Sequence, residues 1–460
     1  CPVPGDDGMT DLGPIRDAIG ELWLAPPDNG EMARESRAFP AFLAACKTLN
    51  PRIEKHGDFA LENALRAIGA PWMSVGNVRP LTPSPEEAAR RIAAALLARR
   101  GRRIHLCPLD GADNLPRWNF GNNCVAKFSP SELDTVISPG RLLRHHARWV
   151  FDSPAFAQVQ WLVVEEELPL DPDPAIRAWP ALGEILGDVD GRIVPHAARF
   201  PEVVEDALFA LLLLPWEDVV EYAEYDWRPF RIPWIYTIDE DIFASPTAPP
   251  DPTSLRWTEV TLTGADGEVI YDERPDVWPL DMSAVEKWPP LDDLSWQRLQ
   301  GARGSQLLTR PVAHFLTRAF LADEIDEFLA HITAIEAALA LRRDHVRAPS
   351  RKKQSACQSG SSGQSIEWRP KLPGDKDPGA TERLNRRIAA LLGLGPCDTA
   401  FRQLYDARSK FLHGAAMNDI PAYERLAARR LARKVIDQLV QCAADRGDVD
   451  RTDFLASLFP

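Results

Sequence analysis

Apolar and polar positions alternate with helical spacing through the first hundred residues. Ser84 precedes Pro85 and two glutamates, and a serine cap followed by proline and acids in the first turn favours a helix start. The apolar residues Ile92 and Leu96 then lie on one side of that helix. The pattern predicts a mostly helical segment over residues 1–100.

Residues 101–300 change to short apolar runs separated by proline, glycine and aspartate, which is typical of strands and turns. Asp266 and Gly267 lie between two such runs and predict a hairpin turn. Residues 203–214 are mostly apolar, with an unbroken apolar run over residues 207–214, and predict a buried helix. We therefore expect an α+β region here, with strands that include residues 104–107, 161–164 and 260–262.

From residue 305 the spacing becomes helical again. It predicts one long helix over residues 309–341. Residues 342–379 are rich in Ser, Gly, Pro, Lys and Arg and predict a flexible basic loop. Further helices are expected over residues 380–392, 398–413 and 421–445. The predicted fold class is an α+β N-terminal region followed by an all-α C-terminal domain over residues 305–460.

Charge divides along the chain in the same way. The net charge of the whole protein is −14, which argues against a general nucleic-acid coat protein. Residues 301–460 nevertheless carry 25 basic and 19 acidic side chains, a net of +6. Residues 1–300 carry 28 basic and 48 acidic side chains, a net of −20. This asymmetry indicates a nucleic-acid-facing part in the last third of the chain.

Cysteine use and hydropathy favour a cytoplasmic protein without a membrane partner. The seven cysteines are widely spaced, odd in number and without a C-x-x-C pair, which suits reduced thiols better than disulfides or zinc. The longest apolar run, residues 207–214, is far shorter than the roughly 20 residues that span a bilayer. His145 and His146 have no carboxylate or cysteine at ligand spacing, so we expect no metal and no cofactor.

The chemistry of the chain is expected at Arg408 and His413, an Arg-x4-His pair near the end of the third C-terminal helix. The same spacing occurs at Arg100 and His105 and at Arg141 and His146. Spacing alone therefore does not identify a site, and the context of each pair has to decide.

The context favours Arg408, because it interrupts the apolar stripe of its helix. A charge on such a stripe is costly unless it is paired or faces a cleft or a partner. Glu336 interrupts the apolar stripe of the first C-terminal helix in the same way, so we predict a buried pair between Arg408 and Glu336. The stripe around Arg408 consists of Phe401, Leu404, Tyr405, Phe411 and Leu412.

The stretch Leu-Tyr-x-x-Arg-Ser-Lys-x-x-His-Gly around Arg408, preceded by the Ile-Glu-Ala that contains Glu336, resembles the HEPN superfamily, specifically its ApeA-like HEPN domain. The resemblance covers residues 310–446. It implies an up-and-down helical bundle that forms a homodimer through the Arg408/His413 helix, so that two copies of each residue meet in one cleft.

The resemblance also implies a metal-independent endoribonuclease in anti-phage defence or a toxin-like system. The 2′-hydroxyl of RNA would attack the adjacent phosphate and leave a cyclic phosphate and a 5′-hydroxyl. His413 would move protons, Arg408 would bind the scissile phosphate and Glu336 would orient Arg408. Ser409 departs from the Asn, Asp or His that often follows this arginine in catalytic members.

RNA is the expected partner, with no DNA predicted, and Lys410 and the basic loop residues Arg351, Lys352 and Lys353 are candidates for binding its backbone. The loop is equally well explained as a disordered insertion, and Lys410 as an ordinary exposed lysine. The main alternative function is a HEPN module that dimerises and binds RNA without cutting it. A chance match in an unrelated helical domain is the third possibility.

Overall fold

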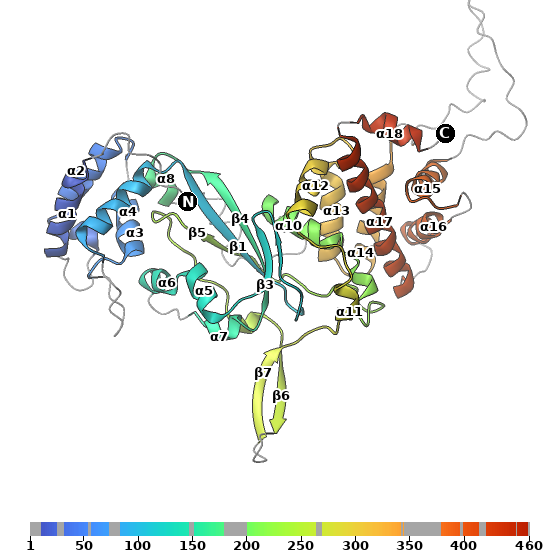
Figure 1. The fold of residues 1–460 in the computed structure, drawn as a ribbon, viewed down its shortest axis with the longest axis horizontal. Helices are drawn as coiled ribbons and strands as arrows, with labels where there is room; N and C mark the ends of the chain where they lie inside the picture. Colours follow the sequence, from blue (N-terminus) through green and yellow to red (C-terminus); the bar gives the residue numbers. More distant parts are fainter. Residues whose placement is uncertain are drawn as a thin grey trace, which may run out of the picture. The chain divides into compact units, whose positions relative to one another are not determined.

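The chain forms two compact units that interleave along the sequence (Figure 1). The first unit contains Cys1–Val203 and Phe230–Trp278, and the second contains Val204–Pro229 and Pro279–Pro460. The division expected from the sequence, into residues 1–100, 101–300 and 305–460, follows chain order instead. The computed structural model describes residues 11–24, 32–53, 57–72, 83–146, 151–178, 200–263, 269–341, 344, 379–395, 399–413, 420–447 and 449–458.

The first unit begins with a helical layer. The predicted start at Ser84 is confirmed, because its Oγ accepts a hydrogen bond of 3.2 Å from the backbone N–H of Glu87. The apolar faces of these helices meet in one core that includes Phe42, Leu61 and Ile92. The helices are α1 (Gly13–Leu24), α2 (Phe39–Leu49), α3 (Gly57–Ile68) and α4 (Pro85–Leu97), with a 3-10 turn η1 at Ala33–Glu35.

A five-stranded sheet follows, in the order β2-β3-β4-β1-β5 with every neighbouring pair antiparallel. The predicted strands around residues 104–107 and 161–164 are its two central strands, and the expected α+β region is confirmed. The strands are β1 (Arg100–Pro108), β2 (Trp118–Phe120), β3 (Asn123–Lys127), β4 (Gln160–Pro169) and β5 (Tyr236–Asp239).

One face of this sheet is covered by three short helices, α5 (Pro130–Ile137), α6 (Pro139–His145) and α7 (Ser153–Phe156). Successive side chains of a strand point to opposite faces, so alternate residues reach this core. The strand residues Ile104, Leu106, Trp161, Val163, Tyr236 and Ile238 pack there with the helix residues Leu133, Ile137, Leu142 and Phe156.

The rest of the first unit consists of short elements. Helix α8 (Pro174–Ala178) follows β4, and a 3-10 turn η3 (Pro252–Ser254) follows β5. Strands β6 (Trp257–Thr263) and β7 (Val269–Pro275) form the predicted hairpin as a separate two-stranded sheet. The predicted turn residues Asp266 and Gly267 lie outside the described residues.

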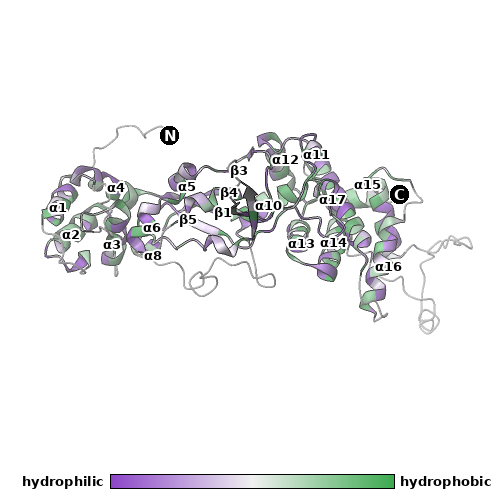
Figure 2. Ribbon diagram, turned by 90° about the horizontal axis from the view of Figure 1, so that it is seen from below, coloured by the Kyte–Doolittle hydropathy of each residue, from purple (hydrophilic) through white to green (hydrophobic). Residues whose placement is uncertain are grey.

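The second unit is helical, and its helices carry apolar and polar residues together, as those of the first unit do (Figure 2). The predicted helix over residues 203–214 is confirmed as α10. The elements are α10 (Glu202–Leu212), η2 (Trp216–Asp218), α11 (Met282–Val285), α12 (Asp293–Arg303), α13 (Arg310–Leu321), α14 (Glu324–Leu339), α15 (Ala380–Leu391), α16 (Ala400–Leu412), α17 (Ala422–Arg446) and α18 (Arg451–Ser457).

The prediction of one long helix over residues 309–341 is wrong, because α13 and α14 are separate helices. Arg228 stabilises the break between them: its guanidinium donates to the carbonyl oxygens of Phe320 and Ala322 and forms an ion pair of 2.8 Å with Asp323. The last carbonyls of a helix have no partner within the helix, so an arginine that reaches them favours a helix end there.

Two further observations concern membrane-spanning helices and disulfides. No helix in the described part of the chain is both long and apolar enough to cross a membrane. The four described cysteines, Cys46, Cys107, Cys124 and Cys442, form no disulfide.

Candidate functional site

The predicted pair of Arg408 and Glu336 forms between helices α16 and α14. The distance from Arg408 Nη1 to Glu336 Oε1 is 3.6 Å. The arginine side chain is 25% exposed and the glutamate side chain 26%. The pair was expected to be buried, and this part of the prediction is wrong, because the two helices leave one side of it open to solvent. A half-open guanidinium can bind an anion that a fully enclosed one cannot.

Tyr405 supports Arg408 from the preceding turn of α16. The guanidinium carbon of Arg408 lies 5.4 Å from the centroid of the Tyr405 ring, within the range of a cation–π interaction. Residues three apart on a helix are neighbours on its surface. Arg408 is thus held by Glu336 on one helix and by Tyr405 on its own.

The apolar stripe of α16 is buried at Phe401, Leu404 and Ala407, but Leu412 is 52% exposed. A separation of eleven residues is just over three full turns, so Leu412 has nearly the same angular position as Phe401. The difference in exposure between Phe401 and Leu412 therefore reflects their positions along the helix axis, because no described element covers Leu412 on the last turn of α16. The expectation that Leu412 lies on a buried face is wrong for this reason.

His413 is exposed at the C-terminal end of α16, where its N–H donates to the carbonyl oxygen of Ser409 at 3.0 Å. Five residues of helix correspond to a rotation of about 140° and a rise of about 7.5 Å. Arg408 and His413 of one chain therefore point to different sides of the helix, and a cleft that contains both needs a further component.

Of the remaining predicted residues, only Lys410 is described. Lys410 is exposed on α16. Arg351, Lys352 and Lys353 lie outside the described residues. Asp344, from the same predicted loop, accepts hydrogen bonds from the buried Arg387 of α15 at 2.5 and 3.1 Å. The start of the expected basic loop is thus fixed to the helices through an acidic side chain.

The other two Arg-x4-His pairs belong to the first unit and serve its structure. His105 is buried in β1, with its ring nitrogens 3.0 Å from Thr237 Oγ1 and 3.1 Å from Glu166 Oε1. Arg141 donates to backbone carbonyls, and His146 Nε2 lies 2.7 Å from the carbonyl oxygen of Pro246. Within the described ranges, no three His, Cys, Asp or Glu side chains are grouped where they could hold a metal ion.

The sequence patterns did not predict a buried polar cluster that forms between η2 and α17. The side chains of Glu217 and Arg429 are completely buried, and Arg433 joins them through an Nε–Oε1 distance of 2.6 Å to Glu217. Arg429 also lies over the ring of Trp227, 4.1 Å from its centroid. The sequence does contain a pattern that could have predicted this cluster. Arginines at positions 425, 429 and 433 are spaced four apart along α17, and this spacing places them on one helix face.

The same cluster continues onto α14 through Glu327 and His331. Trp227 Nε1 donates to Glu327 Oε1 at 2.7 Å. Burial raises the pKa of the Glu327 carboxyl, although the charge of Arg228 opposes this. Burial lowers the pKa of His331 well below its usual value, and the charges of Arg429 and Arg228 lower it further. Burial thus shifts the pKa of each group in the direction of its uncharged form.

Comparison with known proteins adds no relative: no protein-family model, curated protein sequence or solved structure matches the chain.

Proposed function

We propose that the second unit is a HEPN-type domain that cuts RNA without a metal ion, with Arg408, His413 and Glu336 at its active site. The observation that supports this most directly is the Arg408–Glu336 pair between α16 and α14, of which about a quarter of each side chain is exposed. It places a fixed cation at a surface where a phosphate can reach it. The proposed setting is the cytoplasm, in anti-phage defence or a toxin-like system.

The proposed reaction assigns one task to each residue. Arg408 binds the scissile phosphate and stabilises the charge that grows on it. Glu336 orients the guanidinium of Arg408 and so acts as a positioning residue. His413 donates a proton to the leaving 5′-oxygen, a task that suits the C-terminal end of a helix because the dipole there favours a cation. The 2′-hydroxyl gives its proton to solvent and attacks the phosphate, and the bond from phosphorus to the 5′-oxygen breaks, which leaves a cyclic phosphate and a 5′-hydroxyl.

The site is proposed to form between two copies of the chain. Arg408 and His413 of one copy point about 140° apart around the axis of α16. Pairing two α16 helices would bring Arg408 of one copy towards His413 of the other. The half-exposed Leu412 supports this arrangement, since an apolar side chain on the last turn of α16 gains from being covered by a partner.

The test is cleavage of a mixed RNA substrate by purified full-length protein in EDTA. We expect Arg408→Ala and His413→Ala each to lower the rate by about 10²-fold or more. Arg402→Ala is the matched control, because Arg402 is an exposed arginine on the same helix and pairs with Glu382. Glu336→Gln should reduce the rate less than Arg408→Ala does.

The binding alternative predicts a different result in the same samples. RNA would shift in a gel with unchanged length, and Arg408→Ala would weaken the shift and its dependence on salt. Protein that neither cuts nor binds any RNA, or variants at Arg402 and Arg408 that behave alike, would overturn both readings.

A further inference from the structure

The first unit contains a cleft of about 630 Å³, apart from the proposed RNA site. It lies between edge strand β5, helices α5 and α6, and parts of α3 and α4. This volume is in the range of pockets that hold small molecules. One wall is apolar and consists of Ile68, Val136, Ile137, Leu143, Ile238 and Ile242.

Three arginines also line the cleft: Arg91 of α4, and Arg141 and Arg144 of α6. Among the described side chains, no carboxylate lies within ion-pair distance of any of them. The pKa of Arg144 is lowered by burial and then by the charges of Arg91 and Arg141. The three cations therefore repel one another, and an anion between them would relieve that repulsion.

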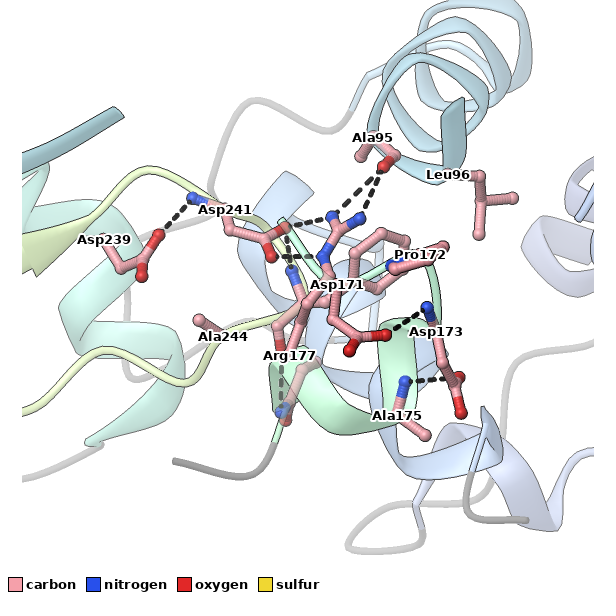
Figure 3. Close-up of polar contacts among 12 residues, drawn as sticks. Ala95, Leu96, Asp171, Pro172, Asp173, Ala175, Arg177, Asp239, Asp241 and Ala244 are labelled. Atoms are coloured by element: carbon pink, nitrogen blue, oxygen red, sulfur yellow. Dashed lines mark hydrogen bonds and ion pairs between the residues drawn. The ribbon is translucent and has the colours of Figure 1, made fainter. Parts of the chain in front are cut away.

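The acidic residues beside the cleft are already engaged. Glu240, which lines it, accepts a hydrogen bond of 2.6 Å from Arg102 Nη1. The carboxylate of Asp241 is held by Arg177 of α8 at 2.6 and 2.7 Å (Figure 3). The charges of Asp239, Asp241 and Glu240 also act on Arg141 and raise its pKa against the effect of burial, so these acids offset part of the positive charge of the cleft.

The two arginines of α6 are also fixed in advance. Arg141 donates to the carbonyl oxygens of Asp239, Asp241 and Ala244 at 2.6 to 2.7 Å, and its Nε is buried without a hydrogen-bond partner. Arg144 donates to the carbonyl oxygens of Arg66 and Ala67 at the end of α3. Groups that are positioned before binding lose little freedom when a ligand arrives.

Arg177 also contacts the segment of residues 239–244, whose carbonyl oxygens accept hydrogen bonds from Arg141. Arg177 donates to the carbonyl oxygen of Ala95 at 3.1 Å, and its guanidinium carbon lies 4.7 Å from the centroid of the Phe243 ring. Figure 3 shows Arg177 between Ala95 and Asp241. Arg141 and Arg177 both bind the loop after β5, and their contacts restrain this part of the cleft lining.

We propose that this cleft binds a small organic phosphate, with the phosphate at Arg91, Arg141 and Arg144 and a flat apolar body on the β5–α5 wall. A phosphate dianion suits three cations better than a single carboxylate does, and the guanidinium of Arg91, which has no hydrogen-bond partner among the described residues, can fork onto its oxygens. The cations are also not part of a generally basic surface, because residues 1–300 carry a net charge of −20. Inorganic phosphate would not contact the apolar residues of the cleft, whereas an organic phosphate with a flat apolar body would.

The experiment is calorimetric titration of the full-length protein with AMP, 1-naphthyl phosphate, adenosine and inorganic phosphate. We expect AMP or 1-naphthyl phosphate to bind at least tenfold more tightly than adenosine or phosphate. Arg91→Ala should weaken that binding at least tenfold. Arg90→Ala, the neighbouring exposed arginine that pairs with Glu87, should leave it unchanged. Arg408→Ala should also leave it unchanged, which separates this cleft from the proposed RNA site.

Three results would overturn the proposal. One is the absence of binding by either organic phosphate at millimolar concentration. Another is inorganic phosphate binding as tightly as AMP, which would show that the apolar wall takes no part. The third is an equal effect of the variants at positions 90 and 91.

Discussion

At the residue scale, His331 is a buried polar side chain of the second unit whose hydrogen-bonding atoms are not satisfied. Its side chain is completely buried on α14, and neither ring nitrogen has a hydrogen-bond partner. The ring lies beside Trp227, with centroids 5.9 Å apart. A charged imidazole in this position would face Arg429 and Arg228 in a low-dielectric interior, so the folded protein holds the ring neutral.

The first prediction concerns the pH dependence that follows from His331. Its pKa is lowered from an ordinary value of 6.5, so the unfolded chain binds a proton more readily than the folded one. Stability is therefore full above pH 6.5 and falls below it, by at most about 1.4 kcal/mol per pH unit. His331→Phe should flatten the change in urea midpoint between pH 7.5 and pH 5.5.

His145 provides the comparison, because burial lowers its pKa to about 3 in the first unit. Its contribution stays in both the parent protein and His331→Phe, and it cancels in the difference between them. An unchanged pH dependence in His331→Phe would show that the ring is not buried neutral.

At the element scale, η2 and α17 are joined by buried charges. Glu217 on η2 lies between Arg429 and Arg433 of α17, and Arg429 Nη2 donates to the carbonyl oxygens of Leu212, the last residue of α10, and of Leu214. Removing one member of a buried pair is strongly destabilising because the other charge stays buried. The segment that contains η2 is thus fixed to α17 by compensation of charge as well as by packing.

The second prediction compares two neighbouring acids of η2. Glu217→Gln should lower the free energy of unfolding by about 3–5 kcal/mol, since two buried arginines lose their counter-charge. Asp218→Asn should cost under about 1 kcal/mol, because the ion pair of Asp218 with Arg430 is exposed. Urea denaturation followed by circular dichroism measures both, and equal losses would contradict the buried role of Glu217.

Whether the sequence predicts a feature of these elements depends on how far apart in the chain the residues lie that determine it. The start of α4 is local, since Ser84 caps a helix within four residues, and it was predicted. The Arg408–Glu336 pair was also predicted, because each charge interrupts the apolar stripe of its own helix. The break between α13 and α14 depends on Arg228, about ninety residues away, and helical periodicity does not contain that contact. The burial of Arg429 depends in the same way on Glu217.

At the scale of the whole molecule, the interleaving of the units decides which fragments can fold. The second unit takes Val204–Pro229 from the middle of the chain. That segment supplies Glu217 to α17, Trp227 to α14 and Arg228 to the break after α13. A contiguous C-terminal piece lacks all three, however complete its helices are. The charge asymmetry along the sequence therefore does not mark a self-sufficient domain.

The third prediction follows from this arrangement. A fragment of residues 279–460 should show a weak, non-cooperative urea transition, because Arg429 and Arg433 lose their buried partner and α10 no longer covers the core. Adding a peptide of residues 200–229 should restore a cooperative transition, whereas the same peptide with Glu217→Gln should restore less. If residues 279–460 alone unfolded cooperatively at the urea midpoint of the full chain, the middle segment would be dispensable. RNA cleavage by that fragment would then be a fair test of the proposed site by itself; otherwise only the full chain can test it.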